Sequence, residues 1–127
     1  MKPVEVLVLD DEAIVCERLR DYLEKKGMSV ETFTESPKAL DRLKEKSFDV
    51  VITDMRMEGA TGMDVLLAAK RDSPGPEVII ITAYAEFETL RGAEAARAFR
   101  YITKPFKMSE MYTLVKKAAR KSRRKST

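Results

Sequence analysis

Residues 6–11 read Val-Leu-Val-Leu-Asp-Asp, an apolar run that ends in two carboxylates. A short run of valine and leucine is typical of a strand that is buried on both faces of a parallel sheet. Two later stretches repeat this plan: Val-Val-Ile-Thr-Asp at 50–54 and Val-Ile-Ile-Ile-Thr at 78–82. We therefore expect these three runs to form the central strands of one sheet.

The sequence around these runs predicts two further strands and five helices. Residues 28–33 and 99–102 mix apolar and polar side chains, which favours strands at the edges of a sheet. Ser36-Pro37 predicts a helix with Ser36 as its N-cap, because proline is favoured in the first helical turn. The segment 86–96 reads as a helix with few large apolar side chains, so we expect it to be loosely held. The other helices are expected to begin near Glu12, Met63 and Ser109.

Five strands that alternate with five helices predict one α/β domain of the flavodoxin-like (βα)5 type. Right-handed crossovers, with the three apolar runs in the middle, lead to a parallel sheet in the order 2-1-3-4-5 with helices on both faces. A length of 127 residues fits a single domain. We place this domain at residues 1–120 and interpret residues 121–127 as a basic tail or the start of a linker.

Composition limits the class of protein further. The chain is 44% hydrophobic and 35% charged, as expected for a soluble domain, and no apolar run approaches the roughly 20 residues that cross a bilayer. The N-terminus leads directly into a strand pattern and does not resemble a signal peptide. Cys16 is the single cysteine, so no internal disulfide can form, and a buried thiol is expected. We expect a cytoplasmic protein that does not contact the membrane.

Charge is unevenly distributed along the chain. The net charge is +3, but residues 116–127 hold seven Lys or Arg and no acid, so the remainder is mildly acidic. Cations are favoured at the C-terminus of a helix, which makes a solvated helix end the simpler interpretation of this basic run. Direct binding of nucleic acid by the domain is therefore not expected, and an acidic partner is the alternative.

Polar side chains follow four of the predicted strands. In sheets of this order, ligands bind beyond the carboxyl ends of the strands, in the crevice between the first and third. Asp10, Asp11 and Asp54 would flank that crevice, and Thr82 and Lys104 would border it. The chain has no histidine, so a metal ion here would be held by oxygen atoms. Oxygen ligands favour Mg²⁺, Mn²⁺ or Ca²⁺ over zinc, and of these we expect Mg²⁺, with Mn²⁺ as the alternative.

This set of side chains is suited to phosphoryl chemistry. Three carboxylates at short range repel one another unless a cation neutralises them, and a divalent ion together with Lys104 would do so. One aspartate could then act as a nucleophile and form an acyl phosphate, while the Thr82 hydroxyl donates a hydrogen bond to a phosphoryl oxygen. Taken singly, Asp11 could be a helix N-cap, Asp54 a loop residue and Thr82 an ordinary strand residue. Their coincidence at four strand ends favours a common site.

The chain resembles the receiver domain of two-component response regulators, over residues 3 to about 120. The resemblance is carried by Val-Leu-Val-Leu-Asp-Asp-Glu at 6–12, Asp-Val-Val-Ile-Thr-Asp-Met-Arg-Met at 49–57, Ile-Ile-Ile-Thr-Ala at 79–83 and Tyr-Ile-Thr-Lys-Pro-Phe at 101–106. The residues of these motifs are most similar to those of regulators of the nitrogen-regulatory type.

The resemblance implies a role for each residue of the predicted crevice. Asp54 would be the phosphoacceptor, supplied by the phosphohistidine of a sensor histidine kinase. Asp11, Asp54 and the backbone carbonyl of Arg56 would bind Mg²⁺ directly, and Asp10 would act through a metal-bound water. Lys104 would pair with the phosphoryl group.

The resemblance also implies roles for residues around the crevice. The peptide bond before Pro105 would be cis. Thr82 and Tyr101 would form the switch pair that responds to phosphorylation. The resemblance implies that Arg56 and Tyr84 would flank the path of the hydrolytic water, and we hypothesise that their bulk prolongs the phosphorylated state.

The function implied is a phosphorylation-dependent signalling switch. Such a domain is not a metabolic enzyme, but it would catalyse its own phosphorylation and slow dephosphorylation. The surface of the fourth predicted helix (86–96), the fifth strand (99–102) and the last helix, which begins near Ser109, would control a downstream effector domain or protein, or form a homodimer. Glu58 departs from the family's usual proline, and Arg97 and Arg100 give that surface an unusual basic patch.

Two other classes of protein remain as alternatives. A phosphohydrolase with an aspartyl nucleophile, of the haloacid dehalogenase type, also combines Asp, Mg²⁺ and Lys. Such an enzyme would carry Asp-x-Asp after its first strand, whereas this chain has Asp10-Asp11-Glu12. The second alternative is an interaction module on the same fold that acts without phosphorylation.

Overall fold

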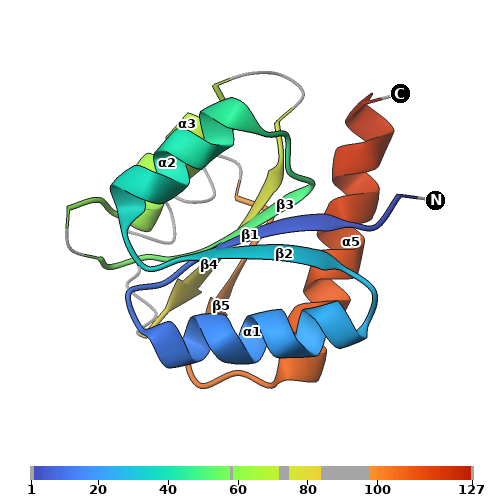
Figure 1. The fold of residues 1–127 in the computed structure, drawn as a ribbon, viewed down its shortest axis with the longest axis horizontal. Helices are drawn as coiled ribbons and strands as arrows, with labels where there is room; N and C mark the ends of the chain where they lie inside the picture. The colour runs from blue at the N-terminus through green and yellow to red at the C-terminus, as the bar shows by residue number, and fades with distance from the viewer. Residues whose placement is uncertain (1, 58, 72–74, 84–97, 127) are drawn as a thin grey trace.

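Five parallel strands form the centre of the molecule in the computed structural model, which describes residues 2–57, 59–71, 75–83 and 98–126. The order of the strands is β2-β1-β3-β4-β5, as the sequence predicts (Figure 1). Every neighbouring pair is parallel. The strands are β1 (Glu5–Leu9), β2 (Ser29–Phe33), β3 (Val50–Asp54), β4 (Glu77–Thr82) and β5 (Arg100–Thr103).

Helices cover both faces of this sheet, so that the fold has three layers. One face packs against α1 (Ala13–Lys25) and α5 (Met108–Ser126), and the other against α2 (Ser36–Glu45) and α3 (Gly62–Ala69). The helix expected at 86–96 lies outside the described residues. No helix in the part of the chain that the structure describes combines the length and hydrophobicity that crossing a bilayer requires.

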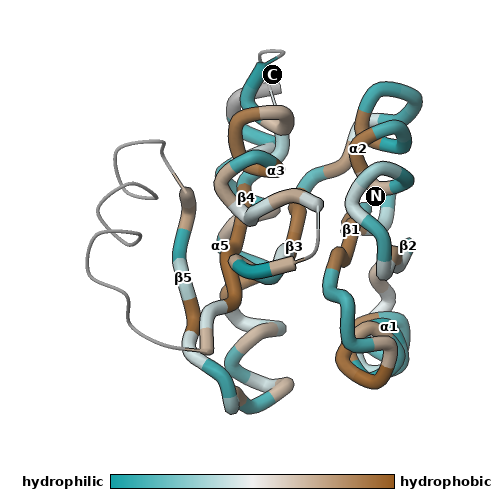
Figure 2. The backbone as a smooth tube through the Cα atoms, turned by 90° about the vertical axis from the view of Figure 1, so that its left-hand side faces the viewer, coloured by the Kyte–Doolittle hydropathy of each residue, from teal (hydrophilic) through white to brown (hydrophobic). Residues whose placement is uncertain are grey.

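Alternate residues of β1 face opposite layers, as the two-residue period of a strand dictates. Val6 and Val8 pack in one apolar cluster with α1 and α5, whereas Leu7 and Leu9 pack in a second cluster with α2 and α3. None of the four side chains is exposed. The central strands are therefore apolar on both faces, and they lie between the helical layers (Figure 2).

The edges of the sheet lie where the mixed sequence patterns predict them. β2 and β5 contain mostly partly exposed residues, whereas every residue of β3 and β4 is buried. Cys16 is buried as a free thiol between α1 and the sheet, as expected. Burial raises the pKa of this thiol, which disfavours the reactive thiolate.

The predicted N-cap of α2 is wrong by one residue. Glu35 is the N-cap, with extended backbone and no capping hydrogen bond from its side chain, and Ser36 is the first residue of the helix. The Ser36 side chain is buried, and its hydroxyl oxygen lies 3.5 Å from the place that a Cβ atom on Gly59 would occupy. Contact with the loop after β3 therefore explains this serine better than capping does.

The C-terminal end of α5 is attached to the edge of the sheet where the strands begin. Ser122 is buried, and Arg123 Nη2 donates to the carbonyl oxygens of Lys2 and Pro3 at 3.0 and 2.8 Å. The same guanidinium lies 3.3 Å from Asp49 Oδ2. Residues 121–126, which the sequence led us to interpret as a basic tail or linker, thus continue α5. Arg123 holds this end of the helix against the N-terminal segment.

A polar cluster at the edge of the sheet joins β2 to α2. Glu31 accepts hydrogen bonds from Arg42 Nε and Nη2 at 2.8 and 3.1 Å and from Lys46 Nζ at 2.9 Å. The hydrogen bonds from Arg42, followed by those from Lys46, lower the pKa of Glu31 from an ordinary value of 4.5 to about 2. The ionised carboxylate therefore stabilises the fold fully above its unfolded pKa, and this contribution is lost as the pH falls through about 2.

Glu31→Gln is expected to lower the free energy of unfolding by about 1 kcal/mol at neutral pH, because partly exposed ion pairs are screened by solvent. The difference from wild type should shrink as the pH falls from 4.5 towards about 2, where the wild-type carboxylate becomes protonated. Urea unfolding at a series of pH values measures this. Glu35→Gln, whose exposed carboxylate contacts Lys38, serves as the control and should show a smaller change. A difference that does not vary with pH would contradict the assignment.

Candidate functional site

The predicted site residues meet at the carboxyl ends of the strands. Asp10 follows β1, Asp54 is the last residue of β3, Thr82 is the last residue of β4, and Lys104 follows β5. The backbone aligns these ends, since Met55 N donates to Ile81 O and Lys104 N donates to Thr82 O, both at 2.8 Å. A cavity of about 320 Å³ opens here; it is lined by Asp11, Glu12, Asp54, Met55, Arg56, Thr82, Ala83 and Lys104.

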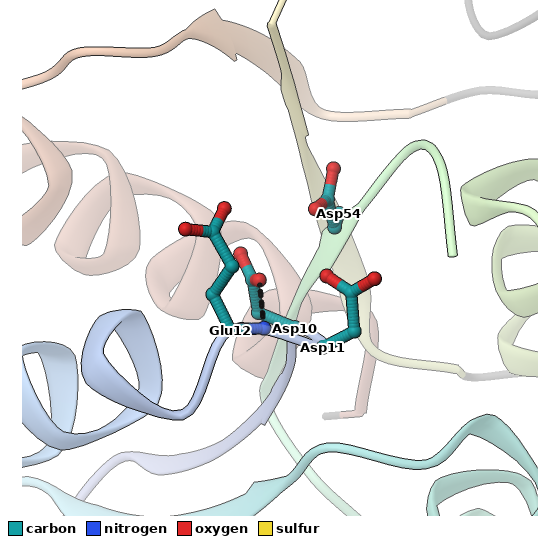
Figure 3. A group of neighbouring side chains, drawn as sticks. All are labelled: Asp10, Asp11, Glu12 and Asp54. Carbon is teal, nitrogen blue, oxygen red and sulfur yellow. Dashed lines mark hydrogen bonds between the residues drawn. The ribbon is translucent and has the colours of Figure 1, made fainter. Parts of the chain in front are cut away.

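Four carboxylates form a cluster on one side of this cavity. Asp10, Asp11, Glu12 and Asp54 each offer one oxygen, and these oxygens lie within 4.8 Å of one another (Figure 3). Asp10 and Asp54 are buried, whereas Asp11 and Glu12 are exposed. The backbone N–H of Glu12 donates to Asp10 Oδ1 at 2.9 Å and fixes the turn that carries the first three. Glu12 also belongs to this cluster, although the sequence predicts no role for it in the site; its position directly after Asp10-Asp11 is the available signal.

Lys104 supplies the positive charge that the cluster requires. Its Nζ lies 2.9 Å from Glu12 Oε1, 3.2 Å from Asp10 Oδ2 and 3.3 Å from Asp54 Oδ2. Burial alone would lower the pKa of this ammonium, but the hydrogen bond to Glu12 and the charges of Asp10 and Asp54 raise it overall. Lys104 is therefore protonated at neutral pH, and it holds Glu12 at a lowered pKa.

Asp10 is the most enclosed carboxylate of the cluster. Its side chain is fully buried, and burial raises its pKa, with the nearby charge of Asp54 adding to the effect. The N–H of Glu12 and the ammonium of Lys104 act in the opposite direction. Asp10 Oδ2 meets Lys104 as an ion pair but accepts no hydrogen bond from the described residues. A buried carboxylate oxygen without a hydrogen bond, beside three more carboxylates, fits a hard divalent cation such as Mg²⁺ or Mn²⁺.

The loop after β3 fixes the position of Asp54. Arg56 and Thr61 pair in an isolated antiparallel bridge, and Thr61 begins α3 with a capping box to Asp64. Gly62 N donates to Met55 O at 2.8 Å, so the first turn of α3 lies directly against the end of β3. A Cβ atom on Gly62 would stand only 2.8 Å from the backbone oxygen of Asp54. A side chain is therefore excluded at this glycine.

The other residues that the sequence predicts for the site differ in their burial, and some lie outside the described part of the chain. The backbone N–H of Arg56, an exposed residue, points to Asp54 Oδ1 at 3.4 Å. Thr82 is buried, and Tyr101 is partly buried beside the cluster of α2 and α3. The peptide bond between Lys104 and Pro105 is cis. Tyr84, together with Glu58 and Arg97, lies outside the described residues.

Comparisons with known proteins agree with this arrangement. The family model of the response regulator receiver domain matches residues 6–116. The DNA-binding transcriptional regulator NtrC of Escherichia coli K12 is 34% identical over 113 residues, which are 89% of this chain and 24% of NtrC. The transcriptional regulatory protein ZraR of the same strain is 31% identical over 115 residues, which are 91% of this chain and 26% of ZraR. The chain thus spans about a quarter of the length of these relatives.

Solved structures show the same similarity over nearly the whole chain. A response regulator receiver domain protein from Clostridium thermocellum superimposes with a TM-score of 0.87 at 32% identity, covering 94% of this chain and 97% of that one. The match to NtrC also agrees with the sequence resemblance to regulators of the nitrogen-regulatory type. With strand order, side-chain cluster, family model and relatives in agreement, the chain belongs to the response regulator receiver domain family.

Proposed function

We propose that this domain is a cytoplasmic switch that accepts a phosphoryl group on Asp54 from the phosphohistidine of a sensor histidine kinase. The observation that carries the proposal is the position of Asp54. Its carboxylate lines an open cavity, 3.3 Å from the ammonium of Lys104 and within reach of three further carboxylates. Such a site brings a nucleophile and the charges that stabilise a transferring phosphoryl group together.

Asp10, Asp11 and Asp54, with the backbone carbonyl of Arg56, would hold Mg²⁺. When bound, the ion offsets the charge of the phosphoryl oxygens and of the carboxylates themselves. The supporting observation is the donor set, which consists of oxygen atoms and includes a buried carboxylate oxygen that accepts no hydrogen bond from the described residues.

In the transfer itself, a carboxylate oxygen of Asp54 forms a bond to phosphorus while the phosphorus–nitrogen bond of the phosphohistidine breaks. The imidazole leaves with the electron pair of that bond. Lys104 and the hydroxyl of Thr82 donate hydrogen bonds to the phosphoryl oxygens, where the charge is concentrated. Slow attack by water on the acyl phosphate would return the domain to its starting state, and we assign Arg56 and Tyr84 the role of slowing it.

The phosphoryl group on Asp54 carries a charge of about −1.5 to −2, in place of the single charge of the carboxylate that it modifies. Thr82 and Tyr101 are the proposed switch pair, and they lie on adjacent strands, with Tyr101 paired to Ile80 of β4. Contacts made only with the phosphoryl group would shift the equilibrium between two states of the surface formed by β5, α5 and the helix that the sequence predicts at 86–96. That surface would control a downstream effector domain or protein, or a homodimer. In this chain it includes Arg100, whose guanidinium lies over the ring of Phe99 at 5.1 Å.

Incubation with a small phosphodonor such as acetyl phosphate in Mg²⁺ tests this proposal. Intact mass should show one added phosphoryl group per chain, and amide NMR signals of β4 and β5 should shift. Failure to take up phosphate would contradict the proposal. Consumption of donor by many turnovers without a phosphoprotein would indicate the phosphohydrolase, and uptake without any change in the NMR spectrum would indicate the phosphorylation-independent module.

A further inference from the structure

Three carboxylates surround the ammonium of Lys104. Nζ donates hydrogen bonds to Glu12 Oε1 at 2.9 Å and to Asp54 Oδ2 at 3.3 Å, and it forms an ion pair with Asp10 Oδ2 at 3.2 Å. A phosphoryl oxygen that binds Lys104 adds a fourth anionic contact. It therefore competes with the carboxylates for the same ammonium.

The exposure of the three carboxylates decides which contact is lost. The side chain of Asp10 is 0% exposed and that of Asp54 is 12% exposed, whereas that of Glu12 is 58% exposed. The phosphoryl group is attached to Asp54 and takes over its contact, so Asp10 and Glu12 are the two carboxylates that remain. Removing the cation from a buried carboxylate such as Asp10 weakens binding by more than about a hundredfold, because the charge is left without compensation. Water can replace the cation at an exposed carboxylate, where the effect is only about two- to fivefold. Of these two partners, Glu12 is therefore the one that gives way.

The backbone around Glu12 supports a function for this side chain other than capping. Glu12 is the N-cap residue of α1, with extended φ and ψ of −90° and 106°, yet its side chain accepts no capping hydrogen bond. The turn is instead fixed by Asp10 Oδ1, which accepts from Glu12 N at 2.9 Å. The Glu12 side chain instead contacts Lys104, whose Nζ donates to Glu12 Oε1 at 2.9 Å.

We propose that Glu12 is a positioning residue that occupies, on Lys104, the place of a phosphoryl oxygen. In the unphosphorylated domain it holds the ammonium at the cavity, and an incoming phosphoryl group competes with it for that ammonium. The inference rests on the proposed function, since it concerns the same site. Its consequence is that the Glu12 carboxylate competes with the phosphoryl group and weakens the binding of anions at Asp54.

Beryllium trifluoride, which mimics a phosphoryl group on a carboxylate, tests this competition without a covalent step. Its dissociation constant is measured by ¹⁹F NMR in saturating Mg²⁺ for wild type, Glu12→Gln and Glu17→Gln. Glu17 is an exposed residue of α1, so its variant removes the same charge about one turn away from the contact. Glu12→Gln should bind the mimic about two to five times more tightly than wild type, and Glu17→Gln should bind as wild type does.

A second measurement separates this role from metal ligation. Outer carboxylates that support or ligate a metal typically change its affinity by about 10–100-fold when removed. The Mg²⁺ dissociation constant of Glu12→Gln, measured by calorimetry, should therefore stay within about threefold of wild type. Tenfold weaker Mg²⁺ binding, unchanged or weaker binding of the mimic, or an equal gain in Glu17→Gln would each overturn the inference. Wild-type protein that binds no mimic at all would instead refute the proposed function.

Discussion

Asp54→Asn is expected to lose all phosphoryl uptake from a small phosphodonor in Mg²⁺. The amide has nearly the shape of the carboxylate, but it carries no charge and is not a nucleophile at oxygen in this chemistry. Asp10 and Asp11 remain in the variant, so the result also tests whether either of them can replace Asp54. Because Asp54 is 8% exposed and its shape is retained, the fold should persist. Intact mass after incubation with the donor gives the result directly.

Asp41→Asn provides the matched control for this experiment. Asp41 lies on the exposed surface of α2, away from the cavity, so its variant carries the same chemical change outside the site. This variant should take up one phosphoryl group as the wild type does. Stoichiometric labelling of Asp54→Asn would refute the assignment of the phosphoacceptor, and circular dichroism of both variants confirms that an absence of labelling is not caused by unfolding.

Gly62→Ala should damage both the fold and the site. The added Cβ would lie 2.8 Å from Asp54 O and 2.9 Å from Met55 Cα, and neither backbone atom can move without moving the end of β3. Overpacking of this kind costs about 1–3 kcal/mol of the free energy of unfolding. Displacement of a reacting group by even about 1 Å can slow a reaction by up to about a hundredfold, so labelling of Asp54 should slow by about tenfold or more. Urea unfolding and a time course of labelling measure the two effects.

Gly27→Ala separates general destabilisation from damage to the site. Gly27 has φ of +87°, which strains any other residue, but no atom lies within 4 Å of the added Cβ. The variant should lose about 1 kcal/mol of stability and keep the wild-type labelling rate, since it is at the end of α1 remote from the cavity. Wild-type stability and labelling in Gly62→Ala would show that α3 can move away from β3 without consequence.

Most of the fold could be predicted from the sequence, because two features of the sequence identify the central strands. Each central run is apolar on both faces, and the runs around 6–9, 50–54 and 78–82 are separated by enough residues for a helix. The order of the strands then follows from the handedness of crossovers. Once the order is known, the carboxyl ends of the strands must meet, and this brings Asp54 and Lys104 together although they are 50 residues apart in the chain.

The features that could not be predicted depend on distances that no pattern encodes. Glu12 looks like a helix-start residue in the sequence, and its contact with Lys104 depends on a side-chain direction. Gly62 looks like a loop glycine, because the approach of α3 to Asp54 is a tertiary contact. Ser36 carries a strong capping signal, but packing against the loop after β3 determines where the helix starts. The basic end of α5 has no apolar period, and its attachment through Arg123 to Asp49 is polar.

The contacts of Arg123 also determine how the domain can be handled. Because this guanidinium binds the carbonyls of Lys2 and Pro3, the first and last described segments lie side by side, at the edge of the sheet opposite the cavity (Figure 1). A fluorophore or surface tether at either end would therefore leave the mouth of the site facing solution. Immobilised protein should leave the cavity equally accessible whichever end is attached.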